Sequence, residues 1–587
     1  MSSHSSLNRR NWRVGCVILA GMLLPVAAQA QTAGDGAATA AQAAAPSDIA
    51  MVNLVRALVA QGVLKADVGD QLIQQAVAEA ATARSARLAG SGELPAPPSG
   101  AVRVPYIPET VRAQIKDDLR QEVLAEARSG GWAAPDRAAP DWTRMFTPRG
   151  DIRVRATQSL ESRTNANDVI DFATINSFGP YGIDDPRVLL PILNTRNNLW
   201  NRTNFRARLG VDVNMTPGVS ARIMLATGDD FGPISTNDTL GGGFLKRDIW
   251  LDKAWIRLQP FKGVDLKLGR FENPFNASDL LFDEDIALDG VSLALDTGTM
   301  LGKGVKLTAR GGAFPIDYGA PNYPTFAFDK PKVPNKTLFS GELQLDAKID
   351  DVAIRTSVGY HDFHGMQGRL SDPCQVEVET FCSTDFLQPL FLTKGNTLSP
   401  LRQIVTINPN ASLPQLLGYT FAYRVLNAEL AVTLPLDDDT LVRATGSYVR
   451  NLGFDRADIC RFGLAGRPYN NNGAGGGTFC AATNPATFVG GKNGYRGELI
   501  VGAIDPLKRG EWRANAGYRY LQSDAVLDAF TDSDFHLGGT NSKGYFIGGS
   551  YAVRNGLVLG ARWLSANEIS GPPLAIDVLQ IDIEARF

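Results

Sequence analysis

Residues 574–587 at the end of the chain (LAIDVLQIDIEARF) decide how the remaining sequence is interpreted. From Leu579 apolar and polar residues alternate without a break: Leu579, Ile581, Ile583, Ala585 and Phe587 share one face, and Gln580, Asp582, Glu584 and Arg586 share the other. A β-strand has a side-chain period of two, so this segment has one apolar and one charged face. The apolar face would meet a core in a soluble sandwich and lipid in a membrane barrel. Alternation alone does not decide between the soluble sandwich and the membrane barrel.

Similar short alternating runs fill residues 151–587. Tight turns such as 216–218, 350–351 and 554–556 alternate along the chain with long polar segments such as 163–201, 362–420 and 452–492. Long structureless loops count against a compact soluble domain, whereas short turns at one end and long loops at the other are typical of outer-membrane barrels. We therefore predict an all-β transmembrane barrel of about 16 antiparallel strands over 151–587.

The strand boundaries that the pattern predicts are 152–161, 202–214, 219–227, 246–259, 264–272, 289–297, 304–314, 336–349, 352–361, 421–434, 440–451, 493–504, 511–522, 542–553, 556–566 and 574–587. An even number of strands returns the chain to the side on which it began. The amino-terminal segment and the end of the chain are thus both expected on the periplasmic side, with the long loops outside.

The first 30 residues are predicted to be a secretory signal peptide. Arg9, Arg10 and Arg13 form a positive start, residues 14–26 are apolar, and Ala28-Gln29-Ala30 is a small-residue cleavage site. No later segment approaches 20 uninterrupted apolar residues, so a membrane-spanning form of this chain must be a closed barrel.

Residues 31–150 are predicted to form a small α-helical periplasmic segment with linkers. Apolar residues recur at helical spacing in 51–59, 64–77 and 108–123, and a Pro/Gly/Ser-rich linker occupies 90–100. The third stretch, which Pro108 opens, could belong to a cap that packs on itself or on the barrel base, or form a coiled coil that joins subunits. Its four-residue spacing (Val111, Ile115, Leu119 and Val123) departs from a strict heptad, which weighs against the coiled coil.

Composition narrows the classes of partner. The 587-residue chain is 44% hydrophobic with a mean hydropathy of −0.10, less apolar than a helical membrane protein. Its net charge of −3 becomes −6 without the three arginines of the signal peptide, so no nucleic-acid partner is expected.

The cysteines that remain after the signal peptide form two local pairs in loop-like segments, Cys374 with Cys382 and Cys460 with Cys480. In an exported protein such pairs indicate disulfides. Neither CxxC spacing nor nearby histidines support a metal site, and we predict no metal or cofactor.

The strand face that would border the lumen is rich in basic residues. This predicted basic wall consists of Arg153, Arg155, Arg206, Arg208, Lys306, Arg310, Arg355, Arg443, Arg496, Arg513, Arg519 and Arg562. Fewer acidic residues share that face. Such a wall would concentrate anions in a water-filled channel; the alternative is that the charges only keep the lumen hydrated.

The most individual stretch is 268–291, LGRFENPFNASDLLFDEDIALDGV. Its Gly-Arg-Phe-x-Asn-Pro-Phe motif over 269–275, followed by an acidic loop, resembles a family of bacterial putative porins, as do the helical lead and the terminal Phe587. The resemblance implies that the third outer loop folds into the pore as a constriction loop, with Asp279, Asp283, Glu284 and Asp285 facing the arginines. The resulting transverse field would orient polar solutes. The alternative is an acidic outer loop that binds a divalent cation.

The terminal Phe587 resembles the closing residue of bacterial outer-membrane barrels, which the barrel-assembly machinery reads as a signal. Taken together, these features predict an outer-membrane porin for passive diffusion of small hydrophilic solutes and ions, with a weak anion preference. Lipid, polar or anionic solutes and the assembly machinery are the expected partners, and the resemblance suggests a homotrimer.

Other functions fit the sequence less well. His361, His364 and His536 lie beside no nucleophile motif such as GxSxG, so the chain is not expected to be an enzyme. His361 and His364 are expected to be polar residues at the barrel rim. The alternative function that stays open is an envelope tether or adhesin that uses the long, disulfide-stapled loops.

Overall fold

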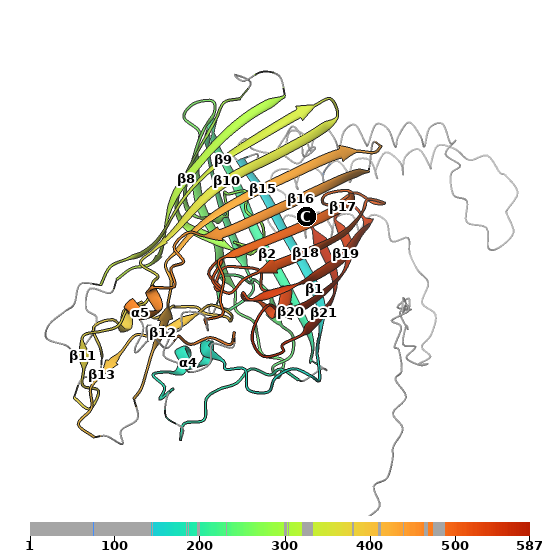
Figure 1. Ribbon diagram of the computed structural model, residues 1–587. Helices are drawn as coiled ribbons and strands as arrows, with labels where there is room; N and C mark the ends of the chain where they lie inside the picture. Colours follow the sequence, from blue (N-terminus) through green and yellow to red (C-terminus); the bar gives the residue numbers. More distant parts are fainter. Residues whose placement is uncertain are drawn as a thin grey trace, which may run out of the picture. The chain divides into compact units, whose positions relative to one another are not determined.

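The computed structural model describes Gln74, Thr143 and residues 145–587, apart from 184, 186, 197–199, 230–231, 299–301, 303, 320–332, 379–380, 409–412, 438–439, 463–467 and 473–487. The chain divides into two units, Met1–Asp118 and Leu119–Phe587. The predicted signal peptide at 1–30 and nearly all of the predicted helical segment at 31–150 lie outside the described residues. The barrel described below belongs to the second unit (Figure 1).

Sixteen antiparallel strands form a closed barrel, as predicted. Each pairs with its neighbours in the chain, and the last pairs with the first through contacts that run from Asp151–Arg586 to Glu161–Ile576. The strands are β1 (Phe146–Glu161), β2 (Trp200–Thr216), β3 (Val219–Ala226), β5 (Trp250–Leu258), β6 (Val264–Glu272), β7 (Ala287–Asp296), β8 (Val305–Asp317), β9 (Lys336–Ile349), β10 (Val352–His364), β15 (Tyr423–Pro435), β16 (Leu441–Asn451), β17 (Asn493–Gly502), β18 (Trp512–Leu521), β19 (Ser542–Arg554), β20 (Leu557–Glu568) and β21 (Ile576–Arg586). The two-residue strand β4 (Asp238–Thr239) adds only to β2.

The first strand starts earlier than its sequence pattern indicates. β1 begins at Phe146 rather than at 152, although Pro148 and Gly150 interrupt the alternation there. Residues 146–150 pair with β2, whereas the ladder to β21 starts only at Asp151. Pro148 therefore lies where one side of the strand has no ladder partner, a place where the missing N–H of proline is tolerated.

Side-chain burial shows which way the alternating faces point. In β21, Ile581 and Ile583 are 52% and 51% exposed on the outside of the barrel, whereas Gln580 and Glu584 are 2% and 9% exposed on the inside. A soluble protein would place these residues the other way round. An outward apolar face with an inward polar face is the arrangement that a lipid-embedded barrel requires.

The connections differ strongly between the two ends of the barrel. At one end the strands are joined by tight turns such as 217–218, 350–351 and 555–556; at the other, which we call the long-loop end, they are joined by long loops. These loops carry α4 (Phe172–Phe178), β11 (Pro373–Cys374), β12 (Leu398–Pro400), β13 (Gln403–Ile404), β14 (Leu417–Tyr419), α5 (Asp458–Phe462) and the 3-10 segments η2 (Asp385–Leu387) and η5 (Phe535–Leu537). In Figure 1, α4, α5, β11, β12 and β13 gather at this end. No helix in the described part of the chain is long and apolar enough to cross a membrane.

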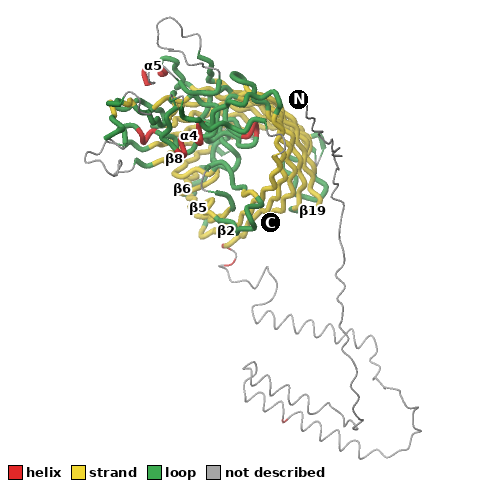
Figure 2. The backbone as a smooth tube through the Cα atoms, turned by 90° about the horizontal axis from the view of Figure 1, so that it is seen from below, coloured by secondary structure: helices red, strands yellow, loops and turns green. Residues whose placement is uncertain are grey.

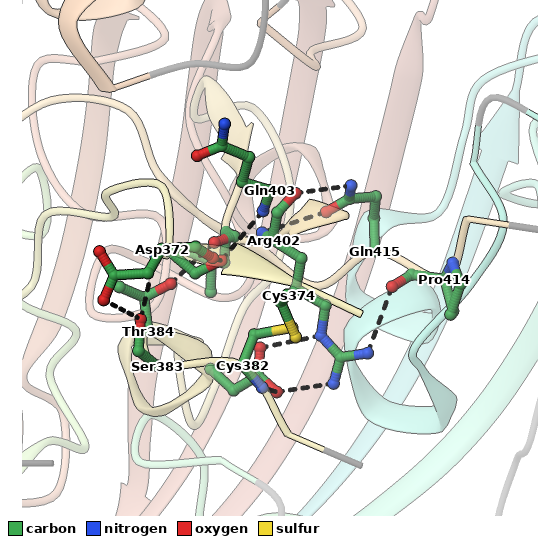
Figure 3. The surroundings of a disulfide bond; sticks show 12 residues. Asp372, Cys374, Cys382, Ser383, Thr384, Arg402, Gln403, Pro414 and Gln415 are labelled. Carbon is green, nitrogen blue, oxygen red and sulfur yellow. Dashed lines mark hydrogen bonds and ion pairs between the residues drawn. A yellow bond between two sulfur atoms is a disulfide. The ribbon is translucent and has the colours of Figure 1, made fainter. Parts of the chain in front are cut away.

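A disulfide fastens the β10–β15 loop (residues 365–422). Cys374 and Cys382 are bonded, with Cα atoms 5.6 Å apart. Beside them the buried guanidinium of Arg402 pairs with Asp385 at 2.6 Å and donates to the carbonyl of Pro414 (Figure 3). Because an ion pair taken out of water needs further hydrogen bonds, these contacts fix the loop in one arrangement. Cys480, the expected partner of Cys460, lies outside the described residues, so that disulfide stays a prediction.

The first residue of the 269–275 motif, Gly269, has a structural role together with a second glycine, Gly290. Gly269 of β6 pairs directly with Gly290 of β7, and both have positive φ, +117° and +143°. A Cβ at Gly269 would lie 2.2 Å from the carbonyl oxygen of Ala254 in β5, and one at Gly290 would lie 2.2 Å from that of Ala313 in β8. Only glycine allows both this backbone conformation and this close approach of strands. The glycine pair therefore shapes the wall just below the β6–β7 connection.

We expect Gly269→Ala to destabilise the barrel by roughly 1–3 kcal/mol, the cost of holding a non-glycine residue in a sparsely populated backbone conformation. The measurement is the urea midpoint of unfolding from lipid vesicles, followed by tryptophan fluorescence.

Gly446→Ala in β16 is the matched control, because a Cβ there meets nothing within 4 Å and no positive φ is involved. Equal midpoints for the two variants would contradict the structural role assigned to Gly269.

Candidate functional site

The β6–β7 loop (residues 273–286) runs across the inside of the barrel. Its residues contact side chains that point inward from strands on several sides of the ring. These contacts are Asn276 N to Glu342 Oε2 of β9 at 2.7 Å, Asn276 Nδ2 to Ser357 Oγ of β10 at 3.0 Å, Asp279 to Arg496 of β17 at 3.0 Å, and Asp285 to Arg206 of β2 at 3.2 Å. Loop segments are visible within the ring of strands in Figure 2.

Apolar side chains anchor this loop to the inner wall. Phe275, Leu280, Leu281, Phe282 and Ile286 are buried. Such burial removes large apolar surface from water and stabilises the inward position by roughly 1.5–3 kcal/mol per fully buried side chain.

His361 lies beneath the loop, in contact with the rings of Phe275 and Phe282 at 5.3 and 5.5 Å. Its ring nitrogens form hydrogen bonds with Ser340 and Asn427, both at 2.9 Å. The expectation that His361 is a rim residue is therefore wrong: the side chain is fully buried.

A second loop, for which the sequence pattern predicts no inward position, also enters the barrel. The β18–β19 loop (residues 522–541) is hydrogen-bonded directly to the β6–β7 loop. The bonds run from Asp283 N to Phe530 O at 2.8 Å, from Ser533 N to Asp283 Oδ2 at 2.9 Å, from Asp532 N to Asp279 O at 3.1 Å, and from Thr531 Oγ1 to Leu280 O at 2.9 Å. The two inner loops thus form one continuous body.

The β10–β15 loop holds the β18–β19 loop in place. Tyr419 donates a hydrogen bond to Asp528 at 2.8 Å, and Thr397 donates to Asp524 through its backbone N–H at 2.8 Å and its hydroxyl at 2.9 Å. Burial raises the pKa of Asp524 and Asp528 to about 6. The signal available in the sequence was the aspartate spacing at 524, 528 and 532, interleaved with apolar residues.

Half of the predicted basic wall meets acids of the two inner loops. These six pairs are Arg155–Asp534 at 3.0 Å, Arg206–Asp285 at 3.2 Å, Arg208–Asp285 at 3.5 Å, Arg496–Asp279 at 3.0 Å, Arg519–Asp532 at 3.0 Å, and Arg562–Asp534. Asp283 and Glu284, predicted to face the arginines with them, line a small cavity of about 70 Å³ together with Arg153, Arg155, Arg206 and Arg562.

The other half of the wall has partners outside the two inner loops. Four of these residues pair with acids, as Lys306–Asp296 at 3.4 Å, Arg310–Glu342 at 2.7 Å, Arg355–Asp346 at 2.6 Å and Arg513–Glu498 at 3.3 Å. Arg153 and Arg443 instead donate to neutral oxygens, those of Asn237 at 2.7 Å and Thr433 at 2.9 Å.

The charges are arranged asymmetrically around the ring. Eight of the twelve basic residues lie on the continuous arc of strands from β17 through β21 and β1 to β2. The acids of the inner loops face this arc, so a field crosses the space between them. A charged cavity of about 220 Å³ lies there, bordered by Arg155, Arg513 and Glu284 among others. A larger cavity has a volume of about 580 Å³. It is lined by Lys306, Arg355 and Arg443 of the strands and by Asn276 of the β6–β7 loop.

Burial and neighbouring charges shift the pKa values of the loop acids in different directions. Burial and the neighbouring Asp532 raise the pKa of Asp283 to about 7, and burial also raises the pKa of Glu284. Burial would raise the pKa of Asp534 as well, but Arg562 and Arg155 outweigh it and hold that pKa below its usual range. Asp283 thus changes its charge near pH 7, somewhat above Asp524 and Asp528 of the β18–β19 loop.

The alternative of a divalent cation on an outer acidic loop does not match this geometry. All four predicted loop acids lie near arginines inside the barrel: Asp279 and Asp285 form the ion pairs given above, and Asp283 and Glu284 share a cavity with arginines. Among the described residues, no group of three or more His, Cys, Asp or Glu side chains is placed to hold a metal ion.

The solved structures to which this chain is similar include the following three. The outer membrane channel DcaP of Acinetobacter baumannii is 11% identical, with a TM-score of 0.35 over 75% of this chain and 97% of that one. Pseudomonas putida OprB, solved at high pH, is 10% identical, with a TM-score of 0.40 over 76% and 95%. Salmonella typhi OmpF in complex with daunomycin is 8% identical, with a TM-score of 0.37 over 75% and 97%.

No curated protein matches the sequence. The family described as putative porin matches residues 48–587, which is most of the chain including the whole barrel and both inner loops. This protein therefore belongs to the putative porin family.

Proposed function

We propose that this outer-membrane channel lets small hydrophilic solutes diffuse passively, with a weak preference for anions. The observation that carries the proposal is the placement of two loops inside a barrel whose outer face is apolar and whose inner face carries arginines. A barrel of 16 strands is wide enough for an aqueous channel. The two inner loops narrow it, and solutes pass beside them.

The loops supply the reason why the anion preference is weak. The strands already contribute acids that pair with part of the basic wall, and the two loops add Asp279, Asp283, Glu284, Asp285, Asp532 and Asp534 to the same space. Each ion pair lowers the net charge that a passing solute meets. Arg153 and Arg443, whose hydrogen-bond acceptors are neutral, contribute positive charge that no directly bonded carboxylate offsets.

The remaining predictions complete the proposal. Residues 31–150 lie in the periplasm, the assembly machinery recognises Phe587, and the protein is a homotrimer. Phe587 closes the barrel by exchanging backbone hydrogen bonds of 2.9 Å with Gly150, which is consistent with a signal that the machinery reads at the seam.

We expect the double variant Arg153→Gln, Arg443→Gln to lose the preference for chloride over potassium. The physical reason is that these guanidinium groups have neutral partners, so removing them lowers the lumen potential without leaving a carboxylate unpaired. The measurement is the reversal potential in planar bilayers under a KCl gradient.

Arg187→Gln is the control, because that arginine lies in the long loop at 162–199 with its side chain 67% exposed, paired with Asp185. No channel current from folded wild-type protein would overturn the channel, whereas cation preference in the wild type would overturn only the anion claim.

Asp279→Asn together with Asp285→Asn should raise the chloride-to-potassium permeability ratio on the order of twofold or more, since both changes free arginines of the opposite wall. Asp185→Asn, outside the lumen, is the matched control and should leave the ratio unchanged. An unchanged ratio in the double variant would mean that the β6–β7 loop does not lie along the conduction path.

Lowering the pH from 8 to 5.5 should increase anion preference. Asp283 has a pKa raised to about 7, so it is mostly charged at pH 8 and mostly neutral at pH 5.5, and protonation removes a negative charge from the lumen. Reversal potentials measured at both pH values test this. Asp283→Asn should reduce the pH-dependent shift; a shift of full size in that variant would assign the titration to another group.

A further inference from the structure

A third cavity, of about 420 Å³, lies at the long-loop end of the barrel, and its chemistry differs from that of the charged spaces. Most of its lining is apolar, including six aromatic side chains: Trp250, Phe282, Phe314, Phe363, Phe391 and Phe530. Cavities of roughly 300–1,000 Å³ with an apolar and aromatic lining are typical small-molecule sites. A cavity of roughly 150 Å³ with a similar lining already accommodates benzene.

The two inner loops separate this cavity from the small cavity of about 70 Å³ that the arginines line. On the β6–β7 loop, Phe282 and Ile286 border the apolar cavity, whereas Asp283, Glu284 and Asp285 between them border the small cavity. The β18–β19 loop is divided in the same way: Ala529 and Phe530 face the apolar side, and Asp532 to Asp534 face the charged side. Each loop thus sorts its residues between two chemically distinct compartments.

The cations that border the apolar cavity are already engaged. Lys336 pairs with Asp317 at 3.1 Å and donates to the carbonyl of Gln388 at 3.0 Å. Arg270 pairs with Asp289 at 3.1 Å. A charged ligand would have to compete for these groups while losing its own hydration, which costs free energy in an apolar environment. The lining therefore favours a neutral ligand.

The aromatic side chains around the cavity pack on one another in favourable geometries. Phe363 and Phe530 are stacked, with centroids 5.7 Å apart and an interplanar angle of 12°, and Phe314 meets Phe275, next to the cavity, edge to face at 5.9 Å. A bound ring would extend this set of aromatic contacts. The cavity also reaches the surface, since two of its lining residues, Trp250 and Leu390, are 41% and 73% exposed.

We propose that this cavity is a binding site for a small neutral aromatic molecule of one or two rings. The site lies beside the charged path and does not depend on ion selectivity. The long-loop end would then have a binding site for an uncharged ring next to a path suited to polar solutes.

The test uses 4-fluorophenol, which is neutral at pH 7, and the full-length protein in lipid nanodiscs. The ¹⁹F line width of the probe should exceed that with empty nanodiscs. Ala529→Trp, which fills the cavity, should abolish the excess. Ala516→Trp, on the exposed outer face of β18, adds the same side chain outside the cavity and should retain it.

The charged analogue 4-fluorobenzoate separates this site from the arginines of the lumen. It should bind at least tenfold more weakly than 4-fluorophenol. Line widths equal to those with empty nanodiscs, which would also result if lipid chains filled the cavity, would overturn the proposal. So would benzoate binding of equal strength, or a folded Ala529→Trp variant that binds like the wild type.

A second measurement on the wild type guards against misfolding of Ala529→Trp. A neutral aromatic diazirine, activated by light, should label residues of the cavity such as Phe363, Met366 and Phe530, as located by peptide mass spectrometry. Labels confined to the lipid-facing side chains would overturn the proposal. Reversal potentials of the wild type are independent of this outcome, so failure of the aromatic site and failure of the channel are distinguishable.

Discussion

The pairing of the last strand with the first is the constraint on which the remaining structure depends. Within hydrocarbon no water is available to bond backbone N–H and C=O groups, so an open sheet edge would leave a row of polar groups unsatisfied at several kcal/mol each. The β1–β21 ladder removes both edges. Once the ring is closed, alternation assigns the residues of the membrane-spanning strands either to lipid or to the interior, and the interior is the favourable side for a charged group such as arginine.

Those arginines in turn determine where the loops can lie. A guanidinium group that is largely removed from water needs carboxylates or carbonyls close by. Arg206, for example, is 5% exposed and meets Asp151, Asp285 and Glu584. One of these three acids comes from the β6–β7 loop rather than from a strand. The buried phenylalanines of the loop and the ion pairs of the wall therefore favour the same inward position, and the loop is held by both.

The sequence alone predicted the barrel well and the interior only in part. Strand period, the number of strands and the alternation of turns and long loops are local properties, and they place most strands within a few residues. The inward β18–β19 loop was not predicted, because its position depends on Tyr419, Thr397 and Asp283, which are more than 100 residues away in the chain. His361 was misjudged for the same reason: its burial comes from Phe275 and Phe282, and no local pattern around it records their approach.

The joined pair of inner loops has a consequence for the order in which this protein matures. The hydrogen bond between Asp283 and Ser533 links positions 250 residues apart, and the second partner belongs to the connection that precedes the last three strands. The narrow part of the passage can therefore take its final shape only when the carboxy-terminal strands are in place. An incompletely inserted chain would lack the joined inner loops, so closure of the ring and completion of its interior go together.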